Sequence, residues 1–408
     1  MRGPPPVHRV QVVKRTLARL DPAALEGRRA LVRVDFNTPI RDGSVSDDTR
    51  IRAALPTIRY LRERGARVVL LSHLGRPKGA PEEKYSLRPV ARALEGLLGA
   101  PVTFLPDPAG EAAVVETKRL PRGGVALGEN TRFYPGEETN DAALAARFAA
   151  LGDLYVNDAF GSAHRAHAST EGVARLLKPA VSGMLMEKEL EYLGQALDDP
   201  RRPFVAILGG AKISGKIDLI EALLPRVDEI LIGGAMACTF FRAMGLETGT
   251  SLVEEDRIDM ARALLEKGGR KIVLPSGAVV GRELTPGTET KTVHRDQIPP
   301  GWAMYDIDQM TEQDYAALID AAGTVVWNGP MGVFETPPFD HGTMAIARAM
   351  AHATDRGVIT IIGGGDSAAA VAQAELAGRM THVSTGGGAS LEFMEGKPLP
   401  GVAALDDA

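Results

Sequence analysis

The sequence predicts an α/β protein of two doubly wound lobes, each a parallel sheet with helices on both faces. Short runs of β-branched residues and leucine alternate along the chain with stretches of helical periodicity, as βαβ units do. Polar residues do not alternate with apolar ones inside these runs, which is typical of strands buried on both faces. The length of 408 residues is too great for one small core and predicts two domains, or three.

The expected strands each end in glycine or a polar residue. In the first half of the chain they begin at Ala30, Arg67, Val102, Gly124 and Leu154. In the second half they begin at Pro203, Glu229, Lys271, Thr324, Val358 and Thr381. Between them, residues 51–64 and 86–98 carry apolar side chains at helical spacing, so we expect helices there. This alternation predicts parallel sheets covered by helices.

A charged, amphipathic helix from Met184 to Ala196 predicts the boundary between the lobes. Asp198, Pro200 and Pro203 then break the chain before the next strand. We therefore assign residues 1–184 to an N-terminal domain, 185–200 to a hinge helix and linker, and 201–388 to a C-terminal domain.

Composition excludes several classes of protein. The formal net charge of -5 argues against a general nucleic-acid binder, which needs many phosphate contacts. The single cysteine, Cys238, excludes an internal disulfide. No apolar run approaches the roughly 20 residues of a membrane helix. The basic, proline-rich start lacks the apolar core of a signal peptide, so we expect a loose extension and a cytoplasmic protein without a membrane partner.

The first lobe carries cations and strong donors just after its strands. Ligands of open parallel sheets bind beyond the carboxyl ends of the strands. These positions hold Asp35, Asn37, Arg50, His73, Arg76, Arg132, His164, Arg165 and His167. Arginine matches carboxylate and phosphate oxygens in pairs, so the set predicts a small, doubly anionic acid as ligand. Any single arginine could instead be a solvated surface residue. Arg33 lies within its strand, and we expect a structural role for it.

The second lobe carries glycines at the same positions. They are Gly209, Gly210 and Gly215, then Gly233 and Gly234, Gly329 before Pro330, Gly363 to Gly365, and Gly386 to Gly388. Glycine lets backbone N–H groups approach a phosphate, and helix N-termini favour anions. The pattern predicts a nucleoside di- or triphosphate, with Asp366 as a candidate ligand of its Mg²⁺. The alternative for any glycine pair is a tight strand–helix turn.

Two common nucleotide motifs are matched only in part. Gly210 to Lys216 has the spacing of a P-loop, but Ile217 stands where that loop needs Ser or Thr. Residues 363–368 fit the dinucleotide pattern, but no acidic residue follows at the required distance. A P-loop ATPase and a dinucleotide dehydrogenase are therefore the weaker enzymatic readings.

Ten ordered motifs make the chain resemble the phosphoglycerate kinase family from about Lys14 to the C-terminus. They are RVDFNTPI, DDTRI, SHLGRP, ENTRF, NDAFGSAHRAHAS, LMEKELEYL, ILGGAKISGKI, NGPMGVFE, GGGDSAAA and STGGGASLE. The resemblance implies two Rossmann-like lobes joined by a hinge helix, with a C-terminal tail of about residues 389–408 packed on the first lobe. It implies reversible phosphoryl transfer between ATP and the carboxylate of 3-phosphoglycerate, with Mg²⁺ accompanying ATP or ADP and a monomeric, glycolytic enzyme.

The resemblance also implies roles for individual residues. 3-Phosphoglycerate would be held by Asp35, Asn37, Arg50, His73, Arg76, Arg132 and Arg165. The nucleotide would be held by Gly209, Lys212, Lys216, Gly233, Asn328, Pro330, Glu335, Gly363, Gly364, Gly365, Asp366 and Ser367. Arg50 and Lys212 would neutralise the phosphoryl group in flight, together with Gly386 and Gly387.

Two stretches depart from the family pattern. Ser276-Gly277 replaces the usual Val-Asp, and residues 304–309, near the expected adenine pocket, replace Gly-Leu-Asp-x-Gly-Pro. A nucleotide-binding homologue that has lost turnover is thus a further alternative, disfavoured because Arg50 and Lys212 are both present.

Overall fold

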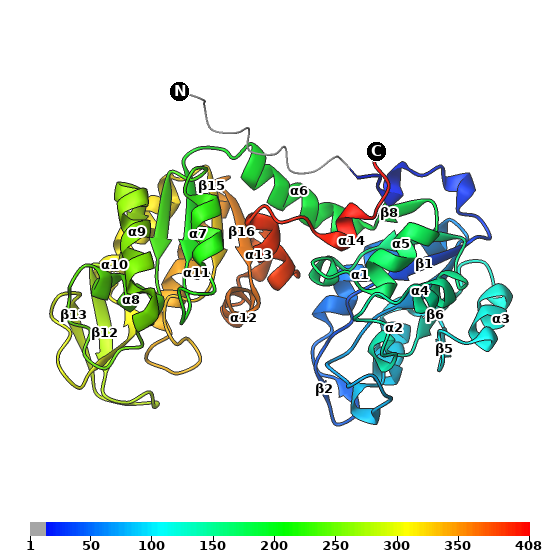
Figure 1. Cartoon of the computed structure of the whole chain (residues 1–408), viewed down its shortest axis with the longest axis horizontal. Helices are drawn as coiled ribbons and strands as arrows, with labels where there is room; N and C mark the ends of the chain where they lie inside the picture. The colour runs from blue at the N-terminus through cyan, green and yellow to red at the C-terminus, as the bar shows by residue number, and fades with distance from the viewer. Residues whose placement is uncertain (1–13) are drawn as a thin grey trace. The chain divides into compact units, whose positions relative to one another are not determined.

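The computed structural model describes residues 14–408, which divide into two compact units (Figure 1). Unit 1 runs to Glu191 and takes in residues 398–408, and unit 2 comprises Tyr192–Lys397. The division falls within helix α6 (Met184–Asp198), inside the segment predicted as hinge and linker. Residues 389–397, expected in the tail on the first lobe, group with unit 2 because α13 (Gly388–Met394) packs against α7 (Ile217–Leu223). The start of the expected N-terminal extension lies outside the described residues.

The core of unit 1 is a parallel six-stranded sheet in the order β5-β6-β4-β1-β7-β8. Its strands are β1 (Arg29–Arg33), β4 (Arg67–Leu71), β5 (Val102–Leu105), β6 (Val125–Gly128), β7 (Leu154–Asn157) and β8 (Ala180–Ser182). Strand order reverses between β1 and β7, so a crevice is expected beyond the carboxyl ends of these two strands.

Alternate residues of β1 point to opposite, equally buried faces of this sheet. Ala30 and Val32 pack with helices α1 (Thr49–Glu63) and α2 (Arg88–Leu98). Leu31 packs on the other face with α3 (Glu111–Arg119), α4 (Ala142–Ala149) and α5 (Val173–Leu176). The prediction of strands buried on both faces is confirmed. Polar residues at every second position would place unpaired polar groups in one of the two cores, which explains why these strands do not alternate.

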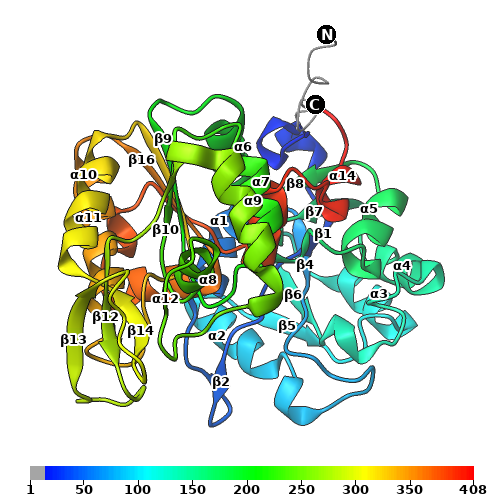
Figure 2. The ribbon, with the colours of Figure 1, turned by 60° about the vertical axis from the view of Figure 1, so that its left-hand side comes forward.

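Unit 2 contains a second parallel sheet, in the order β11-β10-β9-β15-β16-β17. Its strands are β9 (Phe204–Leu208), β10 (Glu229–Ile232), β11 (Ile272–Val273), β15 (Thr324–Asn328), β16 (Ile359–Gly363) and β17 (His382–Val383). Helices α7 and α9 (Ile258–Gly268) lie on one side, and α10 (Gln309–Ala321) and α11 (His341–Asp355) on the other (Figure 2). The remaining helices are α8 (Met236–Ala243) and α12 (Gly365–Gln373). Strand order reverses between β9 and β15, which makes this the predicted ligand crevice of unit 2.

The sequence did not predict the antiparallel elements. A three-stranded sheet of β12 (Gly277–Gly281), β13 (Thr290–His294) and β14 (Ala303–Ile307) extends unit 2, and β2 (Ile40–Arg41) pairs with β3 (Ser44–Val45) in unit 1. Most of β13 is exposed, so it lacks the apolar run that marks a buried strand. Among residues 14–408, no helix is long and apolar enough to span a bilayer.

Both ends of the described chain meet in unit 1. Lys14 Nζ donates to the carbonyl oxygens of Ala403 and Leu405, at 3.2 and 2.9 Å, and pairs with Asp407. Arg15 N donates to Asp406 O at 2.8 Å, next to helix α14 (Pro400–Ala403). These contacts dock residues 398–408 on the unit that begins the chain.

The first turn of α6 is capped from β7 by Asp158. Its Oδ1 accepts from the N–H groups of Leu185 and Met186 at 2.9 and 3.2 Å. Burial raises the pKa of Asp158 to about 6, although hydrogen bonds from Thr57, Met186 and Leu185 favour the charged form. The folded state therefore carries a penalty above pH 6 that is absent below the unfolded pKa near 3.8.

We expect Asp158→Asn to remove this penalty, because the amide oxygen can still accept from the two N–H groups. At about pH 8 the free energy of unfolding of the variant should exceed that of the parent by about 1–3 kcal/mol more than it does at about pH 4. Urea denaturation at both pH values measures the difference. A gain that is equal at both would show that Asp158 does not titrate between them.

Candidate functional site

The cation cluster comprises Asp35, Arg50, His73, Arg132 and Arg165, with Asn37 and Arg76 beside them. Asp35 follows β1 and His73 follows β4 at the carboxyl ends of neighbouring strands. Arg50 lies in the first turn of α1, and Arg132 in the short turn after β6. Arg165 follows β7 and is exposed. Parallel pairing brings these segments to one edge of the sheet, as the strand-end rule predicts.

Asp35 and Arg50 form the central ion pair of the cluster. Arg50 Nη1 lies 2.7 Å from Asp35 Oδ2. Burial alone would raise the pKa of Asp35, but His73, Arg50 and Arg33 outweigh it and hold that pKa below its usual value. Asp35 is therefore ionised at neutral pH and fixes the guanidinium of Arg50, which remains about one third exposed for a ligand.

His73 is a neutral hydrogen-bond donor in this cluster. Burial lowers the pKa of His73 well below 6.5, and the positive charges of Arg33, Arg132 and Arg50 lower it further. The negative charge of Asp35 acts in the opposite direction but does not outweigh them. Its Nδ1 lies 3.1 Å from Nη2 of Arg33. Guanidinium can only donate, so Nδ1 accepts and the ring proton is assigned to Nε2. Because His73 is uncharged at pH 7, the arginines supply the positive charge of the cluster.

Gly75 connects the loop after β4 to two members of the site. Its N–H donates to Asn37 Oδ1 at 2.8 Å, and its carbonyl accepts from Arg132 Nη1 at 2.7 Å. Its φ is +62°, and a Cβ would lie 2.4 Å from the ring of Tyr85. Only glycine fits this position, and it sets the direction of the chain that leads to the exposed Arg76.

The sequence predicted a structural role for Arg33, which the structure confirms, but it did not identify the buried partners of this residue. Arg33, 1% exposed, ends β1 and donates from Nε to Ser169 Oγ at 2.8 Å as well as to His73. Ser169 in turn donates from N and Oγ to the carboxylate of Glu137, at 3.0 and 2.5 Å. Arg33 thus orients His73 and is itself held by a buried carboxylate. The sequence could not show these partners of Arg33, because only the tertiary fold brings residues 137 and 169 to it.

The histidines at 164 and 167 do not form a metal centre. Among residues 14–408, no group of three His, Cys, Asp or Glu side chains is arranged to hold a metal ion. Burial lowers the pKa of His167 to about 3, with Arg33 and Arg132 adding to the effect, so it is neutral.

In unit 2, the glycines after β9, β10 and β15 allow these strand-end turns to pack on one another. A Cβ at Gly209 would lie 2.1 Å from Pro330 O, and one at Gly329 would lie 2.1 Å from Gly209 O. Met331 packs against Gly233, and its Sδ would lie 2.3 Å from a Cβ at that position. At these positions the tight-turn alternative holds, because close backbone approach by itself requires glycine.

The glycines around α12 and α13 are more open. A Cβ at Gly365 or Gly387 would meet no atom within 4 Å. Gly364, φ +86°, precedes α12, and Asp366 is exposed in the first turn of that helix. Backbone N–H groups at this end of α12 can thus approach an anion.

Ser367 and Gly386 are committed to local structure. Ser367 Oγ accepts from Gly329 N at 2.6 Å, which ties α12 to the turn after β15. Gly386 N donates to Ser384 Oγ at 3.1 Å, just before α13. Both residues therefore shape the glycine-rich turns through side-chain to backbone hydrogen bonds.

Lys216 and Asn328 form a polar pair at the switch between β9 and β15. Lys216 Nζ donates to Asn328 Oδ1. Burial lowers the pKa of Lys216 to about 8, although the negative charges of Asp366 and Glu395 act to raise it. Asn328 is 2% exposed, and its Nδ2 has no hydrogen-bond partner within residues 14–408. A Cβ at Gly364 would lie 3.0 Å from that Nδ2. An ammonium, a free amide donor and a helix N-terminus thus meet at one place, which suits a phosphate group.

Lys212 and Glu335 are both exposed. Lys212 stands in the turn after β9, where Glu254 accepts from Ser214 N and Oγ at 3.0 and 2.5 Å. Burial would raise the pKa of Glu254, but these bonds and the charge of Lys212 hold it lower. Glu335 lies in the loop between β15 and α11. The P-loop spacing from Gly210 ends at Lys216, directly before α7. The first residue of that helix is Ile217, which has no hydroxyl group to hold Mg²⁺ as a P-loop Ser or Thr does.

The two departures from the family pattern form a single network at the start of α10. Asp308 Oδ1 accepts from Thr311 N and Oγ1 at 3.0 and 2.6 Å and so caps this helix. Ser276 N donates to Thr311 Oγ1 at 3.0 Å. A Cβ at Gly277 would lie 2.4 Å from Asp308 Oδ2. The two departures thus lie side by side, and Asp308 occupies the space that a side chain at position 277 would need.

The fold and these two sites define the class of the protein. Each unit is a doubly wound α/β domain, and strand ends in one carry an arginine-rich cluster suited to an anion while those in the other carry glycine-rich turns suited to a phosphate. This combination is that of a two-domain α/β phosphotransferase.

Comparison with known proteins identifies the family. The family model for phosphoglycerate kinase matches residues 20–397, so the chain belongs to the phosphoglycerate kinase family. It is 57% identical to the phosphoglycerate kinase of Chloroflexus aurantiacus and 55% identical to that of Synechococcus elongatus, each match covering 97% of this chain and 99% of the relative. The solved phosphoglycerate kinase of Coxiella burnetii superposes with a TM-score of 0.86 at 41% identity, over 96% of this chain and 98% of that one.

Proposed function

We propose that this protein transfers a phosphoryl group reversibly between ATP and the carboxylate of 3-phosphoglycerate. Family membership supports the reaction. The observation that carries the proposal is the Asp35–Arg50 pair with neutral His73 and Arg132, which offers charge and donors to a small dianion. Asn37, Arg76 and Arg165 complete the proposed acid site.

The chemistry needs no general base. The carboxyl group of the acid, with a pKa near 3.5, is ionised at pH 7. What must be overcome is the repulsion between two anions and the charge on the transferring group. Arg50 and Lys212 are proposed to neutralise that charge, together with the N–H group of Gly387. Gly386, proposed as part of the same turn, donates its own N–H to Ser384 Oγ and shapes the turn that presents Gly387. Transfer also requires that water be excluded, so the proposal includes closure of the two units about α6.

The nucleotide is proposed to bind unit 2 through Lys216, Asn328 and the turn at Gly363–Ser367. Gly209, Gly233 and Pro330 shape the pocket by close packing, and Glu335 is proposed to contact the ribose. The exposed Asp366 suits Mg²⁺, which binds through one or two carboxylates together with substrate phosphates. Mg²⁺ would supply charge neutralisation when bound.

A coupled assay tests the reaction. ATP consumption should depend on both 3-phosphoglycerate and Mg²⁺, with ADP and the acyl phosphate as products. Hydrolysis of ATP without the acid would instead support the P-loop ATPase alternative, and binding without turnover would support an inactive homologue.

The pKa of Lys216 predicts how nucleotide binding depends on pH. Burial places that pKa at about 8, so the free protein carries the ammonium below this pH and loses it above. We expect the Kd for ADP to rise about tenfold between about pH 7 and about pH 9.5, the loss of one charge-assisted hydrogen bond. Isothermal calorimetry at both pH values measures this.

Lys216→Gln is the matched control, because it keeps a donor to Asn328 and has no charge to lose. It should bind ADP more weakly at neutral pH, with a pH profile flat over this range. An equal slope in parent and variant would assign the titration to another group.

A further inference from the structure

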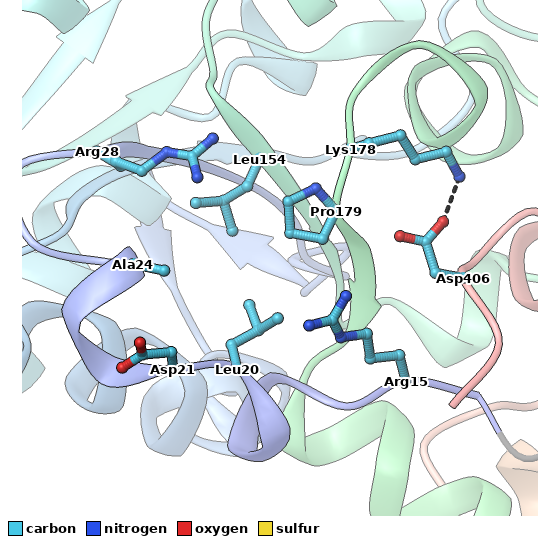
Figure 3. A pocket seen from close by; sticks show the side chains of 9 residues that line it. All are labelled: Arg15, Leu20, Asp21, Ala24, Arg28, Leu154, Lys178, Pro179 and Asp406. Carbon is cyan, nitrogen blue, oxygen red and sulfur yellow. Dashed lines mark hydrogen bonds and ion pairs between the residues drawn. The ribbon is translucent and has the colours of Figure 1, made fainter.

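A cavity of about 430 Å³ lies in unit 1 at the end of the sheet opposite the cation cluster. Leu154 is the first residue of β7, and Pro179 directly precedes β8. The cation cluster follows the carboxyl ends of the same parallel strands, so the cavity is a separate site. Leu20, Asp21 and Ala24, from the first turns of the described residues, and Asp406 from the C-terminal segment complete its walls (Figure 3).

Of the charged residues that line this cavity, Arg15 and Arg28 form no ion pair within residues 14–408, and the carboxylate of Asp21 has no cation partner there. Lys178 is paired with Asp406, and Asp21 Oδ1 accepts from Ala23 N at 3.0 Å. Arg28 uses Nη2 to donate to Asp153 O at 2.5 Å, and its charge contributes, with that of Arg29, to lowering the pKa of Asp153. The guanidinium of Arg15 makes no hydrogen bond or ion pair within residues 14–408, although its charge contributes to lowering the pKa of Asp406.

The two guanidinium groups approach the cavity from opposite sides. Figure 3 shows Arg15 and Arg28 reaching toward the space between them, with Leu20, Leu154 and Pro179 around it. Leu20 and Leu154 are 5% and 1% exposed, so the wall between the cations is apolar. Pockets of roughly 300–1,000 Å³ with an apolar wall and a few placed polar groups are typical of small-molecule sites.

We propose that this cavity binds a small amphipathic anion, with an apolar body of one or two rings and one carboxylate, sulfonate or phosphate group. The apolar body packs on Leu20, Leu154 and Pro179, and the anionic group accepts hydrogen bonds from Arg15 and Arg28. Each guanidinium offers a planar fork of donors that matches such a group. The site goes beyond the proposed phosphotransfer, since it shares no residue with either substrate site.

Occupation of the site should strengthen the docking of the C-terminal segment. Arg15 is joined to that segment by its N–H to Asp406 O at 2.8 Å, and Asp406 N donates to Ala180 O at 2.8 Å. A ligand that contacts both Arg15 and Arg28 would link these contacts of the C-terminal segment to the residue that precedes β1. The amides of Arg15 and Asp406 should then exchange with solvent more slowly when the ligand is bound.

Anilinonaphthalene sulfonate is a suitable probe, because it joins two apolar ring systems to one sulfonate. Titration is followed by fluorescence of the full chain, with ADP and 3-phosphoglycerate at saturation to fill the substrate sites. We expect saturable binding of one equivalent, and slower exchange at residues 15 and 406. Binding abolished by the substrates, or no saturable binding at all, would overturn the proposal.

Three variants locate the probe. Arg15→Ala should weaken binding about tenfold or more, the effect of one lost charge-assisted contact. Ala24→Glu, at an exposed wall position, should weaken it similarly by adding a negative charge without disturbing the core. Arg19→Ala is the control, because Arg19 is exposed in the same segment and does not line the cavity. Equal affinity in all three variants and the parent would refute the site, and all three should retain kinase activity.

Discussion

Arg50→Ala should lower kcat by about 10³ while changing the KM for 3-phosphoglycerate much less, because one charge on the transferring phosphoryl is lost at the transition state. Arg50 is suited to this role because Asp35 holds its guanidinium at 2.7 Å while about one third of the side chain stays exposed. Lys212→Ala should have an effect of the same order, since Lys212 offers the corresponding charge from the turn after β9. Steady-state kinetics in the coupled assay measures both.

The first turn of α1 provides a matched control for this prediction. Arg52 lies two residues from Arg50, is exposed and pairs with Asp48 at 2.8 Å. Arg52→Ala should leave kcat within about twofold of the parent, since exposed ion pairs contribute little. Arg50→Lys should recover part of the lost rate through charge alone. A variant at Arg50 that keeps its turnover and only raises KM would make Arg50 a binding residue without a part in the transfer step.

Gly277→Asp should destabilise unit 2 by about 3 kcal/mol or more, although it restores the residue usual in the family. The new Cβ would lie 2.4 Å from Asp308 Oδ2 and 2.9 Å from Val293 O, and a second carboxylate would be buried beside the first. Asp308→Gly removes the side-chain cap of α10 and should cost only a few tenths of a kcal/mol, because glycine is itself tolerated at this position. Thermal or urea unfolding of each variant measures these costs.

The double variant Gly277→Asp with Asp308→Gly distinguishes an exchange from two unrelated changes. Removing Asp308 vacates the space that the new aspartate needs, so the double variant should be more stable than Gly277→Asp alone by about 2 kcal/mol or more. The remaining contact with Val293 O requires a shift of a few tenths of an ångström in β13. Costs that simply add would show that the two positions are independent. Since both residues serve the cap of α10, kcat of Asp308→Gly should stay near that of the parent.

The sequence predicted the parallel sheets because the strands it identified, such as β9 or β16, are short apolar runs that lead into glycine or a polar residue. It could not predict β13, whose exposed residues carry no apolar pattern, or the three-residue β8. Candidate site residues were found where they directly follow a strand, because parallel pairing alone brings such positions to one edge. Their assignment to substrates remains a prediction, tested by the kinetics above.

The amino-acid sequence by itself determined the alternation of strands and helices, the family, and the chemical contrast between arginine-rich and glycine-rich strand ends. These are local properties, since periodicity and strand-end residues are read within a few positions of one another. Only the tertiary structure decided that Arg33, held by Ser169, contacts His73 directly, that Asp308 fills the space beside Gly277, and that Arg15 and Arg28 face one cavity. Each of these depends on contacts between segments that are separated in the chain and come together only in the folded protein.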